Sequence, residues 1–188
     1  MRDLVYSAML SVDGLIDAAD GDSEWATPDE ELHRHFNDLD RSMGVHLYGR
    51  RMYELMAAYW PTADEVPGVP DYEAEYADIW RAIPKVVFSS TLDRVEWNST
   101  LVRTDAVEEV ARLKQQSGGP MSVGGTALAT SLAKAGLIDE FRFYVMPVIV
   151  GAGTPVFGPL GGHVDLEPVE VRRFGSGAVL MRYRRAES

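Results

Sequence analysis

The chain has 188 residues, no cysteine and a formal net charge of −11. This length suits one domain with its own hydrophobic core, and we expect a single domain over residues 1–188. The lack of cysteine excludes disulfides, thiolate metal sites and a cysteine nucleophile. The four histidines are not spaced as metal ligands, so no metal site is expected.

The charge is unevenly distributed along the chain. Residues 1–84 hold 18 acidic and 6 basic side chains, whereas residues 85–188 hold 11 acidic and 12 basic ones. An acidic surface disfavours nucleic acid and anionic membranes as partners. No apolar run could cross a bilayer and no signal peptide is recognisable, so we expect a cytoplasmic protein that acts on a small molecule.

The first elements are expected to be a strand, a loop and a helix. The apolar run 4–10 predicts a buried strand, and residues 11–24 read as a polar loop. Thr27, Pro28 and Glu30 predict a helix start with Thr27 as N-cap, Pro28 at the first helical position and Glu30 closing a capping box.

The remaining pattern alternates between strands and helices. Further strands are expected at 45–48, 85–90, within 97–104, at 121–123 and over the long stretch 141–150, with helices opening at Gly49 and covering 72–80, 105–116 and 126–135. Segments 169–174 and 178–184 predict a terminal hairpin around two glycines. This order predicts an α/β protein with a mostly parallel sheet and an antiparallel C-terminal hairpin.

Three polar segments follow predicted strands: Gly49-Arg50-Arg51, Ser89-Ser90-Thr91 and Gly124-Gly125-Thr126. In open α/β sheets, ligands bind beyond the carboxyl ends of the strands. Guanidinium groups, hydroxyls and the N–H groups of a helix N-terminus all suit phosphate oxygens. Together the three segments indicate a site for a ligand with several phosphates.

These motifs also support a family resemblance. The segments Ser11–Ile16, Tyr48–Glu54, Val86–Ser90, Val123–Gly125, Leu137–Glu140 and Pro147–Gly153 occur in an order that resembles the dihydrofolate reductase-like superfamily. The chain is most similar to a stand-alone form of the C-terminal reductase domain of the bacterial bifunctional riboflavin-biosynthesis protein. The resemblance spans about residue 3 to the final hairpin, and it implies a three-layer fold.

The resemblance also implies an NADPH site. Gly49 and Arg50, with Arg51 as a second candidate, would hold phosphates on the adenosine side, and Ser89 and Ser90 would approach the ribose and its 2′-phosphate. The pyrophosphate would lie against four residues at the start of the fifth expected helix: Gly124, Gly125, Thr126 and Ala127. The superfamily implies a cis peptide bond between Gly124 and Gly125.

The substrate side departs from the riboflavin-type reductases. Their glutamate before the two glycines is Val123 here, their substrate arginines have only Arg34 and Arg41 as counterparts, and the zinc deaminase domain is absent. Glu31 lies near the place of the buried acid of dihydrofolate reductase. Two roles for Asp13 stay open, that of a turn residue and that of a proton relay near the nicotinamide.

Two tryptophans, Trp25 and Trp60, adjoin the expected mouth of the site and are candidates to wall a planar substrate. The expected function is NADPH-dependent hydride transfer to a small heterocyclic or ribosyl-aminopyrimidine-like substrate. A reductase of pterins or other carbonyl compounds, and a non-catalytic nucleotide-binding protein, stay open as alternatives. A homodimer formed through the sheet edge and terminal hairpin is expected.

Overall fold

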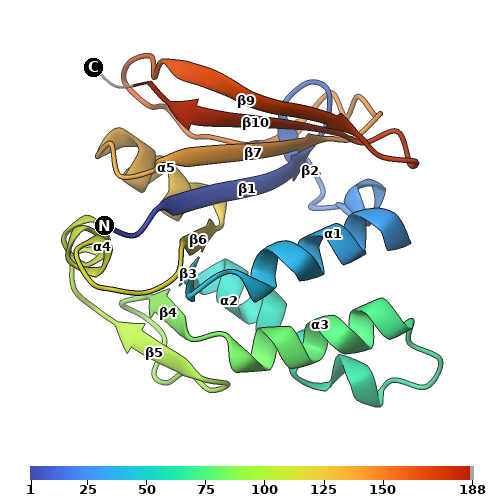
Figure 1. Ribbon diagram of the computed structural model, residues 1–188, viewed down its shortest axis with the longest axis horizontal. Coiled ribbons are helices and arrows are strands. Elements are labelled where there is room, and N and C mark those ends of the chain that lie inside the picture. The colour runs from blue at the N-terminus through green and yellow to red at the C-terminus, as the bar shows by residue number, and fades with distance from the viewer. Residues whose placement is uncertain (187–188) are drawn as a thin grey trace.

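The computed structural model describes residues 1–186, and Figure 1 shows a twisted sheet with helices on both sides. The strands are β1 (Leu4–Leu10), β2 (Leu15–Ala18), β3 (Val45–Gly49), β4 (Lys85–Phe88), β5 (Ser99–Val102), β6 (Met121–Gly124), β7 (Glu140–Val145), β8 (Gly153–Pro155), β9 (Leu166–Arg173) and β10 (Val179–Arg185). The α-helices are α1 (Glu30–Arg41), α2 (Arg50–Ala57), α3 (Asp71–Ala82), α4 (Ala106–Lys114) and α5 (Thr126–Lys134). Short 3-10 helices cover Glu24–Ala26 and Trp60–Glu65.

Eight of the strands form one sheet in the order β5-β4-β3-β6-β1-β7-β10-β9. Every pairing from β5 to β7 is parallel, and the pairings of β10 with β7 and β9 are antiparallel. The expected α/β fold with a parallel centre and an antiparallel C-terminal hairpin is therefore confirmed. Strands β2 and β8 pair separately as a small antiparallel ribbon.

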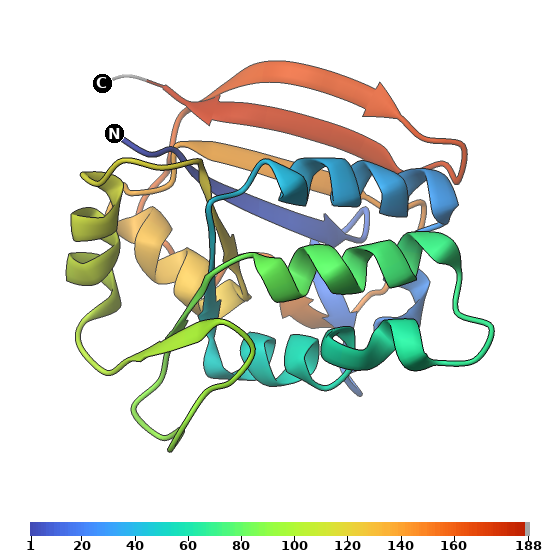
Figure 2. The same cartoon turned by 60° about the horizontal axis from the view of Figure 1, so that its bottom comes forward.

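Helices cover the two faces of the sheet in three layers (Figure 2). Helices α4 and α5 pack on the face that carries Tyr6, Leu47 and Val123, and they share one hydrophobic cluster with it. Helix α1 packs over β7 and β10, while α2 and α3 pack near Tyr48 and Val87 on the same opposite face. The alternation of side chains along each strand thus sends successive residues into two separate cores.

The parallel register aligns the carboxyl ends of the central strands. Tyr48 of β3 lies beside Gly124 of β6, and Gly49 lies beside Phe88 of β4. Helices α2 and α5 begin immediately after β3 and β6. The three polar segments singled out in the sequence therefore meet at one edge of the sheet, which is where open α/β sheets bind ligands.

The start of the first helix was predicted wrongly. Helix α1 begins at Glu30, and its N-cap is Asp29, whose carboxylate accepts a hydrogen bond of 3.0 Å from the backbone N–H of Leu32. Thr27 and Pro28 precede the cap and Glu30 is the first helical residue. The aspartate satisfies an N–H group that the start of the helix leaves unpaired, so the helix begins two residues later than expected.

The expected loop after β1 and the expected long strand near the C-terminus both differ in the structure. The expected loop 11–24 includes β2, and the expected long strand 141–150 ends at Val145. Pro147 lacks an N–H group for sheet pairing, so the chain leaves the sheet there and returns as β8 beside β2. Within residues 1–186, no helix combines the length and apolar character needed to cross a membrane.

The expected cis bond between Gly124 and Gly125 is also corrected, because this peptide bond is trans. The turn from β6 into α5 is instead made at Gly125, which adopts φ +95° and ψ 130°. This left-handed conformation is open to glycine and unfavourable for other residues. A glycine is therefore required here for a different reason from the one that the resemblance implied.

Candidate functional site

An open groove of about 420 Å³ lies beyond the carboxyl ends of β4 and β5. Eight residues line it: Arg50, Phe88, Ser89, Ser90, Thr91, Val102, Arg103 and Thr104. The Arg50 guanidinium contacts the Thr91 hydroxyl at 3.0 Å and Glu54 at 2.8 Å. The Arg103 guanidinium contacts the backbone carbonyl of Ser90 at 3.2 Å. The groove thus combines two guanidinium groups with several hydroxyls, a set that suits phosphate oxygens.

Two helix N-termini open at the same edge of the sheet. Helix α2 starts after Gly49 and α5 starts after Gly125, and neither start has a side-chain cap. The first N–H groups of a helix attract anions when no side chain accepts from them. Thr126 is half-buried at the start of α5, and Ala127 is exposed beside it. Arg50 and the two serines therefore line one groove, while the Gly124–Ala127 turn opens at a neighbouring strand end, beside Tyr48 and outside that lining.

Arg51 lies apart from this group. Its side chain is 85% exposed and approaches the carboxylate of Asp17 at 3.6 Å. It borders a second hollow, with Gly153 and Thr154 of the small ribbon. The two neighbouring arginines thus point to different places, because consecutive residues on a helix lie about 100° apart.

A third cavity, of about 280 Å³, lies between the sheet and helices α1, α2 and α3. Its walls are mainly apolar and aromatic, with Met9, Phe36, Leu39, Met43, Met52, Met56, Trp60 and Tyr144 among them. Gly124 also lines it, so the cavity borders the turn where α5 begins. An apolar cavity with a few polar groups is the usual form of a site for a small organic molecule.

One set of polar groups in this cavity comes from β3, α1 and α3. Tyr48 and His46, on one face of β3, join through a contact of 2.6 Å between the tyrosine hydroxyl and Nδ1 of the imidazole. Asp40 near the end of α1 faces Nε2 of His46 at 3.5 Å and accepts a hydrogen bond of 2.7 Å from the Tyr76 hydroxyl. Burial raises the pKa of Tyr48, and the charge of Asp40 adds to that effect.

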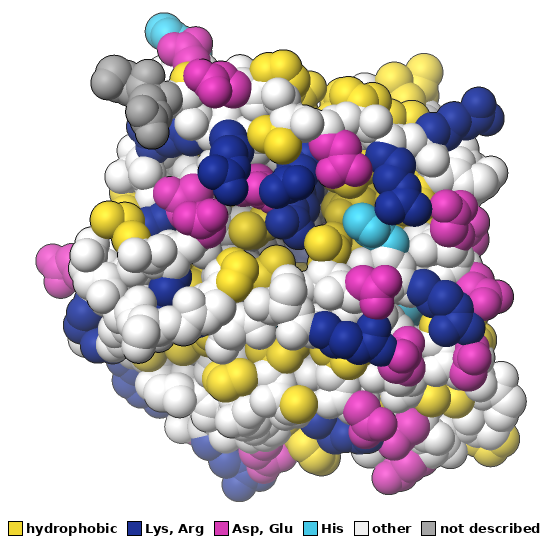
Figure 3. Space-filling view, in the orientation of Figure 1, with side chains coloured by type: hydrophobic (Ala, Val, Ile, Leu, Met, Phe, Trp, Pro, Cys, Tyr) yellow, Lys and Arg dark blue, Asp and Glu magenta, His cyan; other side chains and the backbone are white. Residues whose placement is uncertain are grey.

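Arg142 brings a positive charge to the same cavity from β7. Its Nε contacts the buried carboxylate of Glu140 at 2.6 Å, and Arg182 contacts that carboxylate at 2.8 Å. Within residues 1–186, Nη1 of Arg142 is a buried atom without a hydrogen-bond partner. Figure 3 shows basic and acidic side chains side by side over the strands at this end of the sheet, with hydrophobic side chains beneath them.

The two carboxylates selected from the sequence serve other contacts. Asp13 accepts backbone N–H groups of Val150 at 3.1 Å and Gly151 at 2.7 Å, which ties the turn after β1 to the segment before β8. Glu31 accepts the N–H of Gly175 at 2.8 Å, in the turn of the terminal hairpin. Neither residue lines the cavity.

The two tryptophans also separate. Trp60 lines the cavity, while Trp25 packs against the buried cluster between α1 and the terminal hairpin. Val123, where the riboflavin-type reductases have glutamate, is 2% exposed and packs in the cluster under α4 and α5. Val123 is also one of the residues that line the cavity, so position 123 lies between the cavity and the cluster under α4 and α5.

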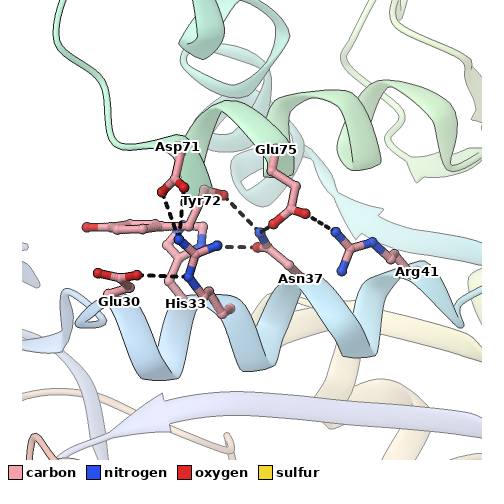
Figure 4. Close-up of polar contacts among 8 residues, drawn as sticks. Glu30, His33, Asn37, Arg41, Asp71, Tyr72 and Glu75 are labelled. Carbon is pink, nitrogen blue, oxygen red and sulfur yellow. Dashed lines mark hydrogen bonds and ion pairs between the residues drawn. The ribbon is translucent and has the colours of Figure 1, made fainter.

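Arg34 and Arg41, the only counterparts of substrate arginines, are engaged between α1 and α3. Arg34 pairs with Glu30 at 2.9 Å and Asp71 at 2.8 Å, and Arg41 pairs with Asp38 and Glu75. Figure 4 shows Asn37 between these pairs, where it donates to Glu75 at 2.7 Å and to the backbone of Tyr72 at 2.9 Å. Both arginines thus hold helix to helix.

Four residues of the site were missed in the sequence: Asp40, His46, Tyr48 and Arg103. The first three line the cavity, and Arg103 lines the groove. A signal existed for the pair on β3, because two polar-tipped residues alternate within an otherwise apolar strand just before Gly49. Asp40 had no comparable signal, since its role depends on how α1 packs against β3.

The sheet that carries this open groove, the two uncapped helix starts and the apolar cavity has a dihydrofolate reductase-like fold. The model of the RibD C-terminal domain matches residues 2–180. The chain belongs to the RibD C-terminal domain family.

Two relatives from Bacillus subtilis (strain 168) are similar over nearly their whole length. YyaP is 30% identical over 183 residues, covering 97% of this chain and 94% of YyaP. YwjB is 28% identical over 195 residues, covering 98% of this chain and 99% of YwjB. Both are described as uncharacterized proteins, so they add family membership without an activity.

Solved structures share the fold at lower sequence identity. A Shewanella sp. PV-4 protein described as a riboflavin biosynthesis protein has a TM-score of 0.78 at 21% identity, with both chains fully covered. A Thermotoga maritima deaminase and 5-amino-6-(5-phosphoribosylamino)uracil reductase has a TM-score of 0.68 at 15% identity. That match covers 98% of this chain and 57% of the longer Thermotoga protein. These likenesses support the dihydrofolate reductase-like fold.

Proposed function

We propose that the protein is an NADPH-dependent reductase that transfers a hydride to a compact heterocyclic or carbonyl compound. The observation that carries this proposal is the placement of two sites at one sheet edge. Arg50 and Arg103 line the groove, Tyr48 and Gly124 line the apolar cavity, and Arg50 follows Tyr48 by two residues at the end of β3. A dinucleotide needs two such sites near each other, because its phosphates and its reactive ring lie far apart.

The residues present fit this cofactor. Arg50, Arg103, Ser89 and Ser90 would hold the adenosine end and its 2′-phosphate, and the start of α5 would hold the pyrophosphate. Gly125 has no side chain to block that helix start, and it makes the turn from β6 into α5 with a φ of +95°. When bound, the cofactor supplies the hydride; the protein orients the reactants and excludes water.

The cavity favours a substrate without a phosphate group. Arg142 is already paired with Glu140, and the arginines of α1 are paired with α3. A phosphoribosyl group like that in the name of the Thermotoga enzyme would find Nη1 of Arg142 without a partner within residues 1–186, but would have to displace existing ion pairs to reach the other arginine nitrogens. A compact heterocycle or carbonyl compound would instead contact the methionines and Trp60. Such a substrate agrees with the alternative, left open by the sequence, of a reductase of pterins or other carbonyl compounds.

The proposal is tested by calorimetric titration of the purified protein with NADPH and, in parallel, with NADH. Micromolar or tighter NADPH binding with weaker NADH binding supports the groove as a 2′-phosphate site. Binding of neither nucleotide rejects the proposal. Binding of NADPH followed by oxidation of the nicotinamide at 340 nm, with a panel of heterocyclic and carbonyl acceptors, separates a reductase from the alternative of a non-catalytic nucleotide-binding protein.

A homodimer and a cytoplasmic location also form part of this proposal. Strand β9 is the edge of the sheet, and its Val169 and Val171 are 44% and 72% exposed. Exposed apolar residues on an unpaired edge suit contact with a second copy of the chain. A Val171→Lys substitution should convert a dimer into a monomer in sedimentation analysis. A wild-type monomer at micromolar concentration would reject this part.

A further inference from the structure

Strand β3 carries two polar residues into the cavity side by side. His46 and Tyr48 lie on the same face of the strand, in register with Ser122 and Gly124 of β6. The hydroxyl of Tyr48 and Nδ1 of His46 are 2.6 Å apart, and the two residues are only 3% and 2% exposed. Such a short contact in a dry setting couples the proton of one group to the other.

The other nitrogen of the imidazole faces a carboxylate. Within residues 1–186, Nε2 of His46 has no hydrogen-bond partner, and Oδ1 of Asp40 lies 3.5 Å from it. The Tyr76 hydroxyl fixes the second oxygen of Asp40 at 2.7 Å. Burial alone would raise the pKa of Asp40, but His46, Tyr76 and Arg142 together hold it below its usual value. Asp40 is therefore an anion beside the imidazole.

These groups form a chain of hydroxyl, imidazole and carboxylate along one side of the cavity. The titratable and charged residues that line the cavity with His46 are Tyr48 on β3, His33 and Asp40 on α1, Tyr76 on α3, and Arg142 and Tyr144 on β7. An imidazole held between a hydroxyl and a carboxylate can move protons between them. These groups line the same cavity as Gly124, where a substrate could contact them.

We propose that Tyr48 is the proton donor for the substrate and that His46 and Asp40 are the positioning residues that return a proton to it. This inference rests on the proposed function. The substrate carbon accepts the hydride from the dihydronicotinamide, which becomes oxidised, and the double-bond electrons move to the substrate oxygen or nitrogen. That atom takes the hydroxyl proton of Tyr48.

Tyr48 then recovers its proton through His46. The Tyr48 oxygen takes a proton from Nδ1 of an imidazolium at His46, and the neutral imidazole takes one from water. The carboxylate of Asp40 stabilises the imidazolium on the side of Nε2. The burial that raises the pKa of Tyr48 keeps its hydroxyl protonated until a strongly basic atom forms beside it.

The experiment compares two kinds of hydride acceptor in the NADPH-loaded protein, aromatic aldehydes and the quinone menadione. An aldehyde becomes a strongly basic alkoxide unless a proton is delivered, whereas a quinone becomes a much weaker base. Tyr48→Phe should lower kcat/KM for aldehydes by about 10²- to 10⁴-fold and leave menadione reduction and NADPH affinity nearly unchanged. Tyr53→Phe is the matched control, because Tyr53 is a buried tyrosine outside the cavity. This variant should keep both aldehyde and menadione reduction.

A second readout needs no turnover. Nitrogen-15 NMR of labelled histidines, with His46 assigned through His46→Gln, should show Nδ1 shifting in Tyr48→Phe and Nε2 shifting in Asp40→Asn. An unmoved His46 spectrum in both variants overturns the proton chain. So does an equal loss of aldehyde and menadione reduction, or no loss of either, in Tyr48→Phe.

The failure of the proposed function has a different signature. A wild-type protein that binds no NADPH, or that binds it and reduces no acceptor, rejects the reductase and this proton chain together. Wild-type reduction of both acceptors with an unselective Tyr48→Phe variant rejects the proton chain alone.

Discussion

Tyr48 lies directly beside Gly124 on the neighbouring strand, and a Cβ atom at Gly124 would come within 3.1 Å of the tyrosine ring. The same Cβ would also come within 3.1 Å of Met52 on α2. The absence of a side chain at position 124 therefore leaves space for a tyrosine at the cavity edge. Tyr48 and Gly124 both line the cavity, and Arg50 of the groove follows Tyr48 by two residues.

Gly125 provides a direct test of the start of α5 as the pyrophosphate site. Gly125→Ala should abolish NADPH binding and cost about 1–2 kcal/mol of unfolding free energy, because alanine is unfavourable at φ +95°. Calorimetry and urea denaturation measure the two effects. Gly162→Ala is the control, since no heavy atom lies within 4 Å of its Cβ position. Retention of tight NADPH binding in Gly125→Ala would remove the turn from the site.

Arg50 should contribute through charge. Arg50→Ala should weaken NADPH binding at low salt by about 1.5–3 kcal/mol, which is roughly 10- to 150-fold, and by less at high salt because ions screen an exposed guanidinium. Arg94→Ala is the control, because Arg94 also carries an exposed guanidinium and lies outside the groove. Titrations with NADPH and NADH at two salt concentrations measure the effect. Equal affinities of Arg50→Ala and wild type at low salt would contradict it.

Asp13 should contribute to the stability of the fold in a pH-dependent way. Hydrogen bonds from Ser11, Val150 and Gly151 lower the pKa of Asp13 to about 2 in the folded protein, against about 3.9 in an unfolded chain. Because the folded pKa is the lower one, the contribution is complete above about pH 4 and is lost as the pH falls toward 2. Asp13→Asn should therefore be less stable than wild type at pH 7.

The difference between wild type and Asp13→Asn should shrink between about pH 4 and pH 2, as measured by thermal unfolding. Asp93→Asn serves as the control, because Asp93 is an exposed aspartate elsewhere on the surface. A difference that stays constant down to pH 2 would show that the charge of Asp13 does not hold the two loops together.

Asn37 should be the strongest single support of the wall formed by α1 and α3. It is fully buried and contacts Glu75, the Tyr72 carbonyl and His33 Nδ1. Asn37→Ala removes the hydrogen bond to the Tyr72 carbonyl and the contacts with Glu75 and His33, and it should cost about 1–3 kcal/mol in urea denaturation. Gln116→Ala, on an exposed residue, should cost under about 0.5 kcal/mol. Comparable losses in the two variants would contradict this role.

The groove could be predicted from the sequence, and the cavity could not. Arg50, Ser89 and Gly125 follow three strands of a parallel sheet, so their convergence depends only on the fold class. The contact of Asp40 with His46 depends instead on the path of α1 across the sheet, which local patterns do not encode. Glu31 was selected because of its place in the first helix, yet that turn of α1 faces the terminal hairpin.

The backbone error at Gly124–Gly125 has a similar origin. Two adjacent glycines indicate an unusual turn, but they do not say which torsion angle makes it. The cis bond came from the resemblance, whereas this chain makes the turn with φ at Gly125. The requirement for glycine was therefore predicted correctly and its geometry was not.

The contacts between α1 and α3 have a consequence for molecules that approach the cavity. Arg34 with Asp71, Arg41 with Glu75 and the buried Asn37 fasten the two helices at successive turns. Widening the cavity on this side would break several of these contacts at once. These contacts therefore fix the spacing between the two helices. Compounds too thick for that spacing would be excluded by size, before any of their polar groups forms a hydrogen bond in the cavity.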